Sequence, residues 1–397
     1  MRITDLRCVV YQGECDHDGP YYGDRQVRPT DIYESFRIKE WGREDNLPHE
    51  IETGKLRIAG RFLYVDTDEG VSGLFGPIGL APAILALQMK SLIVGLDPLA
   101  TNMIWDVLYR AAIHGRKGTP MLAISAIDCA LWDLKGKVMG QPLYRLLGGP
   151  TRTHIPAYVS ALAYPVQPEF VEQQSRRFAE QGYFGQKWFF RHGPGDGRVG
   201  LKKNLAMLEA ARSGAGEECN IMLDAWNSWS VPYTLEFTAE AKRFNPYWIE
   251  EPVLPDMLDQ MAELTRRSPV RIAGGEHEYT RWGFLDIFQR QALDIVQADP
   301  MWCGGITEMI SICALASAYG KTVIPHGESI AVCAHVVASQ PPDLCPLVEN
   351  LEKFNVGWQH FLVDPVRPIG GRITLDERPG LGLVIDENKV KSKSSLG

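Results

Sequence analysis

The fold of this chain is decided by a short stretch at residues 247–252, YWIEEP. An apolar triplet runs into two adjacent carboxylates, and a proline ends the run. If residues 247–251 form a β-strand, successive side chains point to opposite faces, so Glu250 and Glu251 cannot share one environment. One reading is a strand that runs out into solvent, where Pro252 ends the pairing. The other is a strand that carries one acid into a site, and the surrounding sequence decides between them.

Eight runs of this kind follow one another from about residue 155, separated by polar turns and amphipathic helical segments. They are IPAYVSA (155–161), FGQKWFF (184–190), CNIMLDAW (219–226), YWIEEP (247–252), VRIAGGEH (270–277), LDIVQADP (293–300), KTVIPHG (321–327) and, less clearly, LCPLVEN (344–350). Eight strands that alternate with helices predict an α/β fold, a (β/α)8 or TIM-like barrel.

The segments on either side of these runs have a different pattern. RIAGRFLYVDTDEG (57–70) predicts a strand of a small antiparallel sheet, and PAILALQMKSLIVGLDPL (82–99) and ATNMIWDVLYRAA (100–112) show helical spacing. We expect an α+β domain over residues 1–125, the barrel over 126–362, and a tail over 363–397 that returns to the first domain. The last residues, KVKSKSSLG, are polar and are expected to be frayed.

The composition and charge are those of a globular protein and argue against nucleic-acid-binding, secreted and membrane proteins. Apolar residues make up 45% and charged residues 23% of 397 residues, and the formal net charge of −8 argues against a nucleic-acid partner. The N-terminus has no signal-peptide core and no stretch resembles a membrane span, so we expect a cytoplasmic protein. The eight cysteines form no C-x-x-C pair and are expected to be reduced and mostly buried.

Five of the runs end in a polar residue at a nearly constant step. These residues are Asp224, Glu250, Glu276, Asp299 and His326, separated by 26, 26, 23 and 27 residues. One unit of such a barrel takes about thirty residues, so the five side chains are expected at the same level on successive strands. That level is the C-terminal mouth, where barrel enzymes keep their active sites.

The first three of the five residues are acids on consecutive strands. Asp224, Glu250 and Glu276 cannot all stay ionised in a concave, partly dry site unless a cation neutralises them. Ligation by oxygen alone favours Mg²⁺ over zinc. The sequence therefore predicts Mg²⁺ at these three acids. It also predicts that Glu250 points into the mouth, whereas Glu251 faces a neighbouring strand or the helix layer.

Asp299 and His326 come from consecutive strands, so the carboxylate can hold one ring nitrogen and leave the other to accept a proton. This pair predicts a general base. His277, next to Glu276, could donate to a substrate oxygen or simply pack. Lys187, on the strand before Asp224, is expected to be buried against the metal–carboxylate cluster or a substrate carboxylate.

These residues closely resemble those of the enolase superfamily and, within it, the mandelate racemase group of acid-sugar dehydratases. The resemblance covers almost the whole chain, including ALWDLKGKVMGQPLYRLLGG (130–149), the strands ending LDAW, WIEEP and GGEH, and the tail PGLGLVID. KWFFRHGPGDG, QADPMWCGGITE and IPHG look most like the L-rhamnonate dehydratases. The resemblance implies that the first domain caps the barrel, that Asp224, Glu250 and Glu276 bind Mg²⁺, and that His326 with Asp299 is the base.

The chain departs from many relatives on its second strand. There, relatives carry a Lys-x-Lys pair whose second lysine is a base on the opposite face, but this chain has Lys187-Trp188-Phe189. Glu349 stands where relatives place an acid that hydrogen-bonds the substrate carboxylate. In rhamnonate dehydratases a histidine and an arginine of the capping domain reach the sugar, for which His17 and Arg37 are candidates.

The implied reaction is the dehydration of an aldonate to a 2-keto-3-deoxy acid. His326 would take the C2 proton, giving an enolate, and the same residue is the expected acid for the departing C3 hydroxyl. An L-rhamnonate-like substrate and a five-carbon acid such as L-lyxonate both fit. The alternatives are a racemase or epimerase of a 2-hydroxy acid, which needs bases on both faces, and a barrel that binds metal or sugar acid without turnover. Relatives also imply a homo-oligomer.

Overall fold

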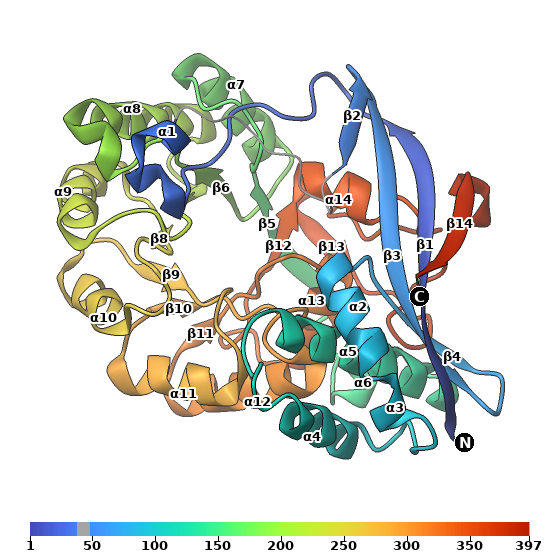
Figure 1. Ribbon diagram of the computed structural model, residues 1–397. Helices are drawn as coiled ribbons and strands as arrows, with labels where there is room; N and C mark the ends of the chain where they lie inside the picture. Colours follow the sequence, from blue (N-terminus) through green and yellow to red (C-terminus); the bar gives the residue numbers. More distant parts are fainter. Residues whose placement is uncertain (38–47, 397) are drawn as a thin grey trace.

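The structure is a computed structural model that describes residues 1–37 and 48–396. Its larger part is a curled sheet of parallel strands with helices outside it (Figure 1), in the order β11, β10, β9, β8, β7, β6, β5, β12. The strands are β5 (His154–Ser160), β6 (Gly185–Phe189), β7 (Asn220–Asp224), β8 (Trp248–Glu250), β9 (Ile272–Gly274), β10 (Ile295–Val296), β11 (Thr322–Val323) and β12 (Val348–Leu351). Each predicted run coincides with one strand, which confirms the predicted fold class.

Each strand is followed by a helix that covers the outside of the sheet. The helices are α7 (Pro168–Glu180), α8 (Gly197–Ala215), α9 (Val231–Ala241), α10 (Leu258–Arg267), α11 (Thr280–Arg290), α12 (Gly305–Ala318), α13 (Ile330–Ser339) and α14 (Glu352–Trp358). The strand order begins at β11 and ends at β12. A hydrogen bond from the Val323 N–H to the Leu344 carbonyl (2.8 Å) joins the segments at these two ends.

The side chains inside the barrel lie in layers. One apolar cluster consists of Tyr158, Met222, Trp248, Ala273, Ile295, Ile324 and Leu347. Two positions further along the same strands, where side chains again face inward, stand Ser160, Asp224, Glu250, Gly275, Gln297, His326 and Glu349. The alternation of the strands therefore places a mostly polar layer directly above an apolar floor, at the C-terminal mouth. Of the five residues expected at one level, Asp224, Glu250 and His326 belong to this layer, whereas Glu276 and Asp299 stand one and two residues beyond it.

The smaller part of the molecule is an antiparallel sheet beside the barrel (Figure 1). Its strands are β1 (Ile3–Asp16), β2 (His49–Glu52), β3 (Lys55–Thr67), β4 (Ser72–Phe75) and β14 (Ser392–Leu396), with the helices α2 (Leu80–Gln88), α3 (Lys90–Ile93) and α4 (Thr101–Ala111) beside them. Helix α5 (Thr119–Met139) contacts both β4 and α12 of the barrel. The predicted domain boundary at residues 125 and 126 falls inside α5, so its position stays a prediction.

The expectation that the last residues are frayed is wrong. Strand β14 pairs antiparallel with β1, with Leu396 opposite Cys8 and Ser392 opposite Gln12. The segment is polar because it is the exposed edge strand of the sheet, not because it is unpaired. In the same tail, β13 (Arg372–Thr374) pairs with β5, so the tail contacts the barrel as well as the smaller sheet.

The cysteines and the helices bear on two expectations from the composition. All eight cysteines are free thiols, and six of them are buried. Among residues 1–37 and 48–396, every helix is too short or too polar to cross a membrane.

Candidate active site

Lys187 lies at the centre of the polar layer. Its Nζ is 2.6 Å from Glu250 Oε1, 3.0 Å from Glu349 Oε1 and 3.4 Å from Asp224 Oδ2. The strand register explains the cluster. Asp224 on β7 is paired with Glu250 on β8, and Phe189, two residues after Lys187 on β6, is paired with Asp224. The three strands therefore bring Lys187, Asp224 and Glu250 to the same side of the barrel interior. Burial lowers the pKa of Lys187, but the surrounding carboxylates outweigh it and raise the pKa well above its usual value. Lys187 is therefore a fixed positive charge.

The acids predicted to hold the metal are all buried. Burial, with smaller contributions from neighbouring acids, raises the pKa to about 7 for Asp224, about 8 for Glu250 and about 7 for Glu276. Lys187 opposes the shift at Asp224 and Glu250, and His326 opposes it at Glu276. The mouth thus holds more buried acid than its own cations neutralise, which is the environment of a divalent metal site.

The structure corrects the expectation for Glu251. Strand β8 ends at Glu250, and Glu251 has a positive φ of 41°, so the strand alternation stops one residue earlier than assumed. Its carboxylate turns toward the mouth, where Oε2 lies 2.8 Å from His277 Nδ1 and accepts a 2.6 Å hydrogen bond from Asn227 Nδ2. The side chain also lies against the neighbouring strand β9, where a Cβ added at Gly274 would be 3.2 Å from Glu251 Cγ. Glu251 therefore faces the end of that strand with its carboxylate in the mouth, and does not face the helix layer.

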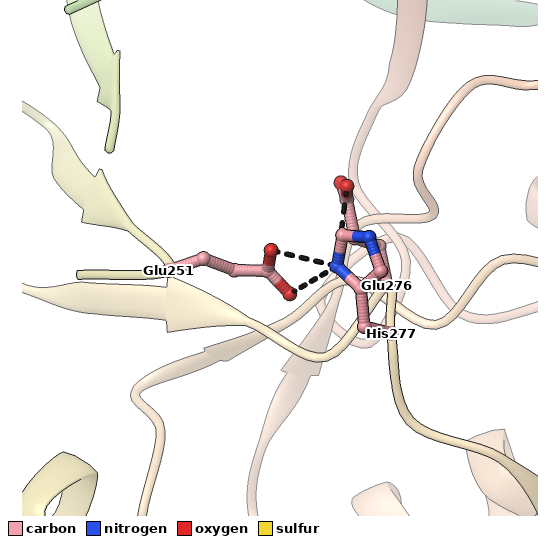
Figure 2. A group of neighbouring side chains, drawn as sticks. All are labelled: Glu251, Glu276 and His277. Carbon is pink, nitrogen blue, oxygen red and sulfur yellow. Dashed lines mark hydrogen bonds and ion pairs between the residues drawn. The ribbon is translucent and has the colours of Figure 1, made fainter. Parts of the chain in front are cut away.

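Figure 2 shows the resulting group of Glu251, Glu276 and His277, whose candidate ligand atoms all lie within 4.8 Å of one another. Burial lowers the pKa of His277, but the charge and hydrogen bond of Glu251 raise it to about 9. His277 is thus held by an acid through Nδ1, and within the described part of the chain Nε2 has no hydrogen-bond partner. This arrangement agrees with a donor to a bound ligand better than with simple packing.

Asp299 and His326 form the predicted pair. Asp299 Oδ2 is 2.6 Å from His326 Nδ1, and Asp299 Oδ1 accepts a 2.6 Å hydrogen bond from the Met301 N–H, which orients the carboxylate. The free ring nitrogen, Nε2, lies 3.5 Å from Glu276 Oε2. The Trp302 ring packs on both imidazoles, with its centroid 4.8 Å from that of His326 and 5.5 Å from that of His277. The imidazole therefore presents one nitrogen to the acid cluster.

The remaining predicted residues lie in different places. Glu349 is buried in the polar layer, where Oε2 accepts a hydrogen bond from the Gly327 N–H (3.1 Å). His17 packs against Tyr21, and Arg37 donates to the Gly195 carbonyl; no contact between either side chain and the acid cluster is found in the described residues.

Three residues of the mouth were not expected from the sequence. Asn227 follows β7 by three residues and lacks the strand-end spacing of the acids. Trp302 gives no signal of its own beyond being aromatic. Glu328 was visible as an acid two positions after His326, yet it lies out of phase with the strand ends. Its N–H donates to Asp299 Oδ2 (3.3 Å), and burial raises the pKa of its carboxyl to about 8.

Comparison with known proteins places the chain in a family. Residues 169–389 match the model of the enolase C-terminal domain-like family, and residues 43–148 match the mandelate racemase / muconate lactonizing enzyme N-terminal domain. The chain belongs to the enolase superfamily, in its mandelate racemase group.

Its relatives include proteins similar over nearly the full length. A putative L-rhamnonate dehydratase of Caldivirga maquilingensis is 31% identical, covering 98% of this chain and 95% of the relative. An L-rhamnonate dehydratase of Saccharopolyspora erythraea is 33% identical, covering 80% of this chain and 81% of that protein. The solved structure of rhamnonate dehydratase from Gibberella zeae complexed with Mg is 29% identical with a TM-score of 0.82, and covers 98% of this chain and 96% of that chain.

Proposed function

We propose that this protein is a Mg²⁺-dependent hydro-lyase that dehydrates an aldonate to a 2-keto-3-deoxy acid. The observation that carries the proposal is the His326–Asp299 pair, whose free Nε2 lies 3.5 Å from Glu276 in the acid cluster. The relatives named as L-rhamnonate dehydratases, one of them in complex with Mg, support the same reaction.

The donor chemistry of the predicted ligands fits a magnesium ion, although among the described residues the structure brings Glu251, Glu276 and His277, and not the predicted three acids, within 4.8 Å of one another. Asp224, Glu250 and Glu276 supply only carboxylate oxygens, which Mg²⁺ prefers, and their raised pKa values mark an uncompensated excess of acid. In the alternative group of Figure 2, the His277 nitrogen is already hydrogen-bonded to Glu251, so it is a poorer ligand. When bound, Mg²⁺ would offset the negative charge that develops on the substrate carboxylate as C2 loses its proton.

His326, oriented by Asp299, carries out both proton transfers. Asp299 holds the proton on His326 Nδ1, so Nε2 carries the lone pair that removes the C2 proton and leaves an enolate. The same imidazolium returns that proton to the C3 hydroxyl, the C3–O bond breaks, and water leaves. The enol formed tautomerises to the 2-keto-3-deoxy acid, so atoms and charge balance.

Lys187, Glu349 and His277 act as auxiliaries. Lys187 keeps Glu250 and Glu349 in place through contacts of 2.6 and 3.0 Å and lowers the cost of their burial. His277 offers Nε2 to a substrate oxygen, and Glu349 is the acid proposed to hydrogen-bond the substrate carboxylate, to which it donates in its protonated form. Phe189 lies under Lys187, with the ammonium 5.3 Å from its ring centroid. A racemase would need a base at this position, and phenylalanine cannot serve as one.

The test is to incubate the purified protein with Mg²⁺ and a library of aldonic acids and to measure keto-acid formation. We expect turnover of at least one acid, and loss of turnover in His326→Asn with Mg²⁺ binding retained. Full turnover by this variant would remove the pair from the mechanism. In D₂O, deuterium at C2 without loss of the hydroxyl would identify an epimerase instead.

Two further expectations belong to this proposal. We propose a cytoplasmic enzyme that acts as a homo-oligomer on a small anionic substrate. Cell fractionation and size-exclusion chromatography with light scattering test the two statements separately.

A further inference from the structure

Residues 20–27 form a strap that leaves the antiparallel sheet after β1 and runs along the rim of the barrel mouth (Figure 1). The Gly23 N–H donates to the Ala163 carbonyl (2.8 Å), and the Val27 N–H donates to the Phe190 carbonyl (2.6 Å). These two carbonyls belong to the loops that follow β5 and β6. The strap therefore borders the polar layer on the side of these two strands.

Lys353, at the start of α14, fastens the strap. Its buried ammonium donates to the carbonyls of Tyr21 (2.7 Å), Ala163 (3.0 Å) and Pro20 (3.4 Å), and the Tyr21 hydroxyl donates back to the Lys353 carbonyl (3.1 Å). Within residues 1–37 and 48–396 this ammonium forms no ion pair. Because its three hydrogens all go to main-chain carbonyls, Lys353 holds the path of the strap and does not depend on the strap's side chains.

The contacts meet at Ala163, whose carbonyl accepts from both Gly23 and Lys353. Ala163 has a positive φ of 66°, which alanine rarely adopts. A Cβ added at Gly23 would lie 2.7 Å from the Pro165 nitrogen and 2.9 Å from the Ala163 oxygen, so the strap passes this loop with no room for a side chain. The strap, the strained loop after β5 and the start of α14 therefore form one closely fitted joint.

This joint lies next to the part of the polar layer that is proposed to hold the substrate carboxylate. Lys353 follows Glu349 by four residues, Ala163 follows Ser160 by three, and their strands β12 and β5 are hydrogen-bonded neighbours. The residue after Ser160 donates its N–H to the Lys187 carbonyl (2.8 Å). Short connections thus link the joint to both Glu349 and Lys187.

We propose that Lys353 is a positioning residue that fastens the strap over the β12, β5 and β6 side of the mouth and thereby retains the substrate over Glu349 and Lys187. The retention of substrate rests on the proposed function, whereas the fastening of the strap does not. Since the carbonyls take all three hydrogens of the ammonium, Lys353 has none left for the substrate. Its loss should therefore weaken substrate binding more than it slows the chemical steps.

The fastening is tested by limited trypsin digestion in the absence of substrate. Arg25 lies in the strap with its guanidinium buried against Asp31 (2.8 Å), so trypsin can cut after it only when the strap is released. Lys353→Met removes the ammonium and keeps most of the side-chain volume. It should raise the rate of cleavage after Arg25 by about tenfold or more, measured by mass spectrometry of the N-terminal fragment. Gly23→Ala should do the same from the other side of the joint, with Lys353 intact.

The retention of substrate is tested by steady-state kinetics on an aldonate that the wild-type protein turns over. Lys353→Met and Gly23→Ala should each raise KM by about tenfold and change kcat by less than about threefold. The matched control is Lys321→Met, because the Lys321 ammonium also donates to a main-chain carbonyl, that of Leu293 (2.8 Å), but at the opposite end of the barrel strands. The control should change neither KM nor the rate of cleavage after Arg25.

Unchanged cleavage in both Lys353→Met and Gly23→Ala would overturn the fastening, and if Lys353→Met does not fold, Gly23→Ala decides alone. Faster cleavage with an unchanged KM would overturn the retention of substrate. A loss of kcat at constant KM would also overturn it, because Lys353 would then act on the chemical steps. If the wild-type protein binds Mg²⁺ but turns over no aldonate, the proposed function is wrong, and the cleavage rates still decide whether Lys353 fastens the strap.

Discussion

Glu250 and Glu251 are neighbours in the chain, yet they have different partners. Glu250 contacts Lys187 and accepts from Trp248 Nε1 (3.0 Å), whereas Glu251 contacts His277 and Asn227. If Glu250 is the metal ligand, Glu250→Gln should weaken Mg²⁺ binding by about tenfold or more, and Glu251→Gln by much less. Isothermal titration calorimetry measures both. The reverse order would assign the ion to the group shown in Figure 2.

Lys187 neutralises acids that would otherwise be buried together. Lys187→Met should lower the free energy of unfolding by about 3–5 kcal/mol at pH 8, because the acids lose the lysine that neutralises them. The loss should be smaller at pH 5.5. Burial raises the pKa of Asp224 and Glu250 to about 7 and about 8, so both are protonated there. Urea unfolding at the two pH values checks this, with the exposed Lys203→Met as control; a pH-independent loss would contradict it.

At the scale of elements, His335 joins α13 to α6 (Leu143–Leu146). Its Nδ1 accepts a hydrogen bond from the Tyr144 N–H (3.2 Å), and burial lowers its pKa to about 4. Because the folded state disfavours the protonated ring, stability is complete above about pH 6.5 and declines as the pH falls toward 4. This single group should contribute about 3 kcal/mol to that decline.

The variant His335→Asn isolates this contribution, because its amide oxygen can accept from Tyr144 without titrating in this range. Its stability between pH 7 and pH 4 should fall less steeply than that of the wild-type protein. If the free energy of unfolding, measured with denaturant, falls equally with pH in the variant and the wild-type protein, His335 does not cause the loss of stability at low pH.

Strand β14 completes an antiparallel sheet through backbone hydrogen bonds to β1. Deleting residues 391–397 should cost about 2 kcal/mol, because several paired groups of β1 lose their partners. Replacing Lys391 and Lys393 by alanine removes surface ion pairs, to Glu14 (2.6 Å) and Glu387 (3.1 Å), and should lower the stability far less than the deletion does. Equal effects in thermal unfolding would indicate that charge, not strand pairing, holds the segment.

The sequence predicts those elements whose signal is periodic. The eight apolar runs place the strands, and the step from Asp224 to His326 places Asp224, Glu250 and His326 in the polar layer, because every unit of the barrel repeats the same geometry. Glu276 and Asp299 lie one and two residues beyond that layer, because their strands end earlier relative to these acids. The sequence does not predict the position of Glu251, which depends on one positive φ at the end of β8. Nor does it predict β14, because a polar edge strand and a frayed tail have the same composition.

At the scale of the whole molecule, the excess of acid in the mouth links metal binding to stability. A ligand that binds only the folded state stabilises it, by about 2.7 kcal/mol at one hundred times its Kd. We therefore expect Mg²⁺ to raise the Tm and EDTA to reverse the rise, as measured by calorimetry. The double variant Asp224→Asn, Glu276→Gln should lose this response; a retained response would place the ion elsewhere.

The pairing of β14 with β1 determines when the antiparallel sheet can be completed during synthesis. Strand β1 is synthesised long before β14, so its sheet lacks one edge strand until residues 392–396 have been made. The barrel strands, in contrast, pair mostly with the next segment along the chain and can assemble during synthesis. A polypeptide that lacks β14 would carry a complete barrel beside an antiparallel sheet whose β1 edge is unpaired and exposed to other chains.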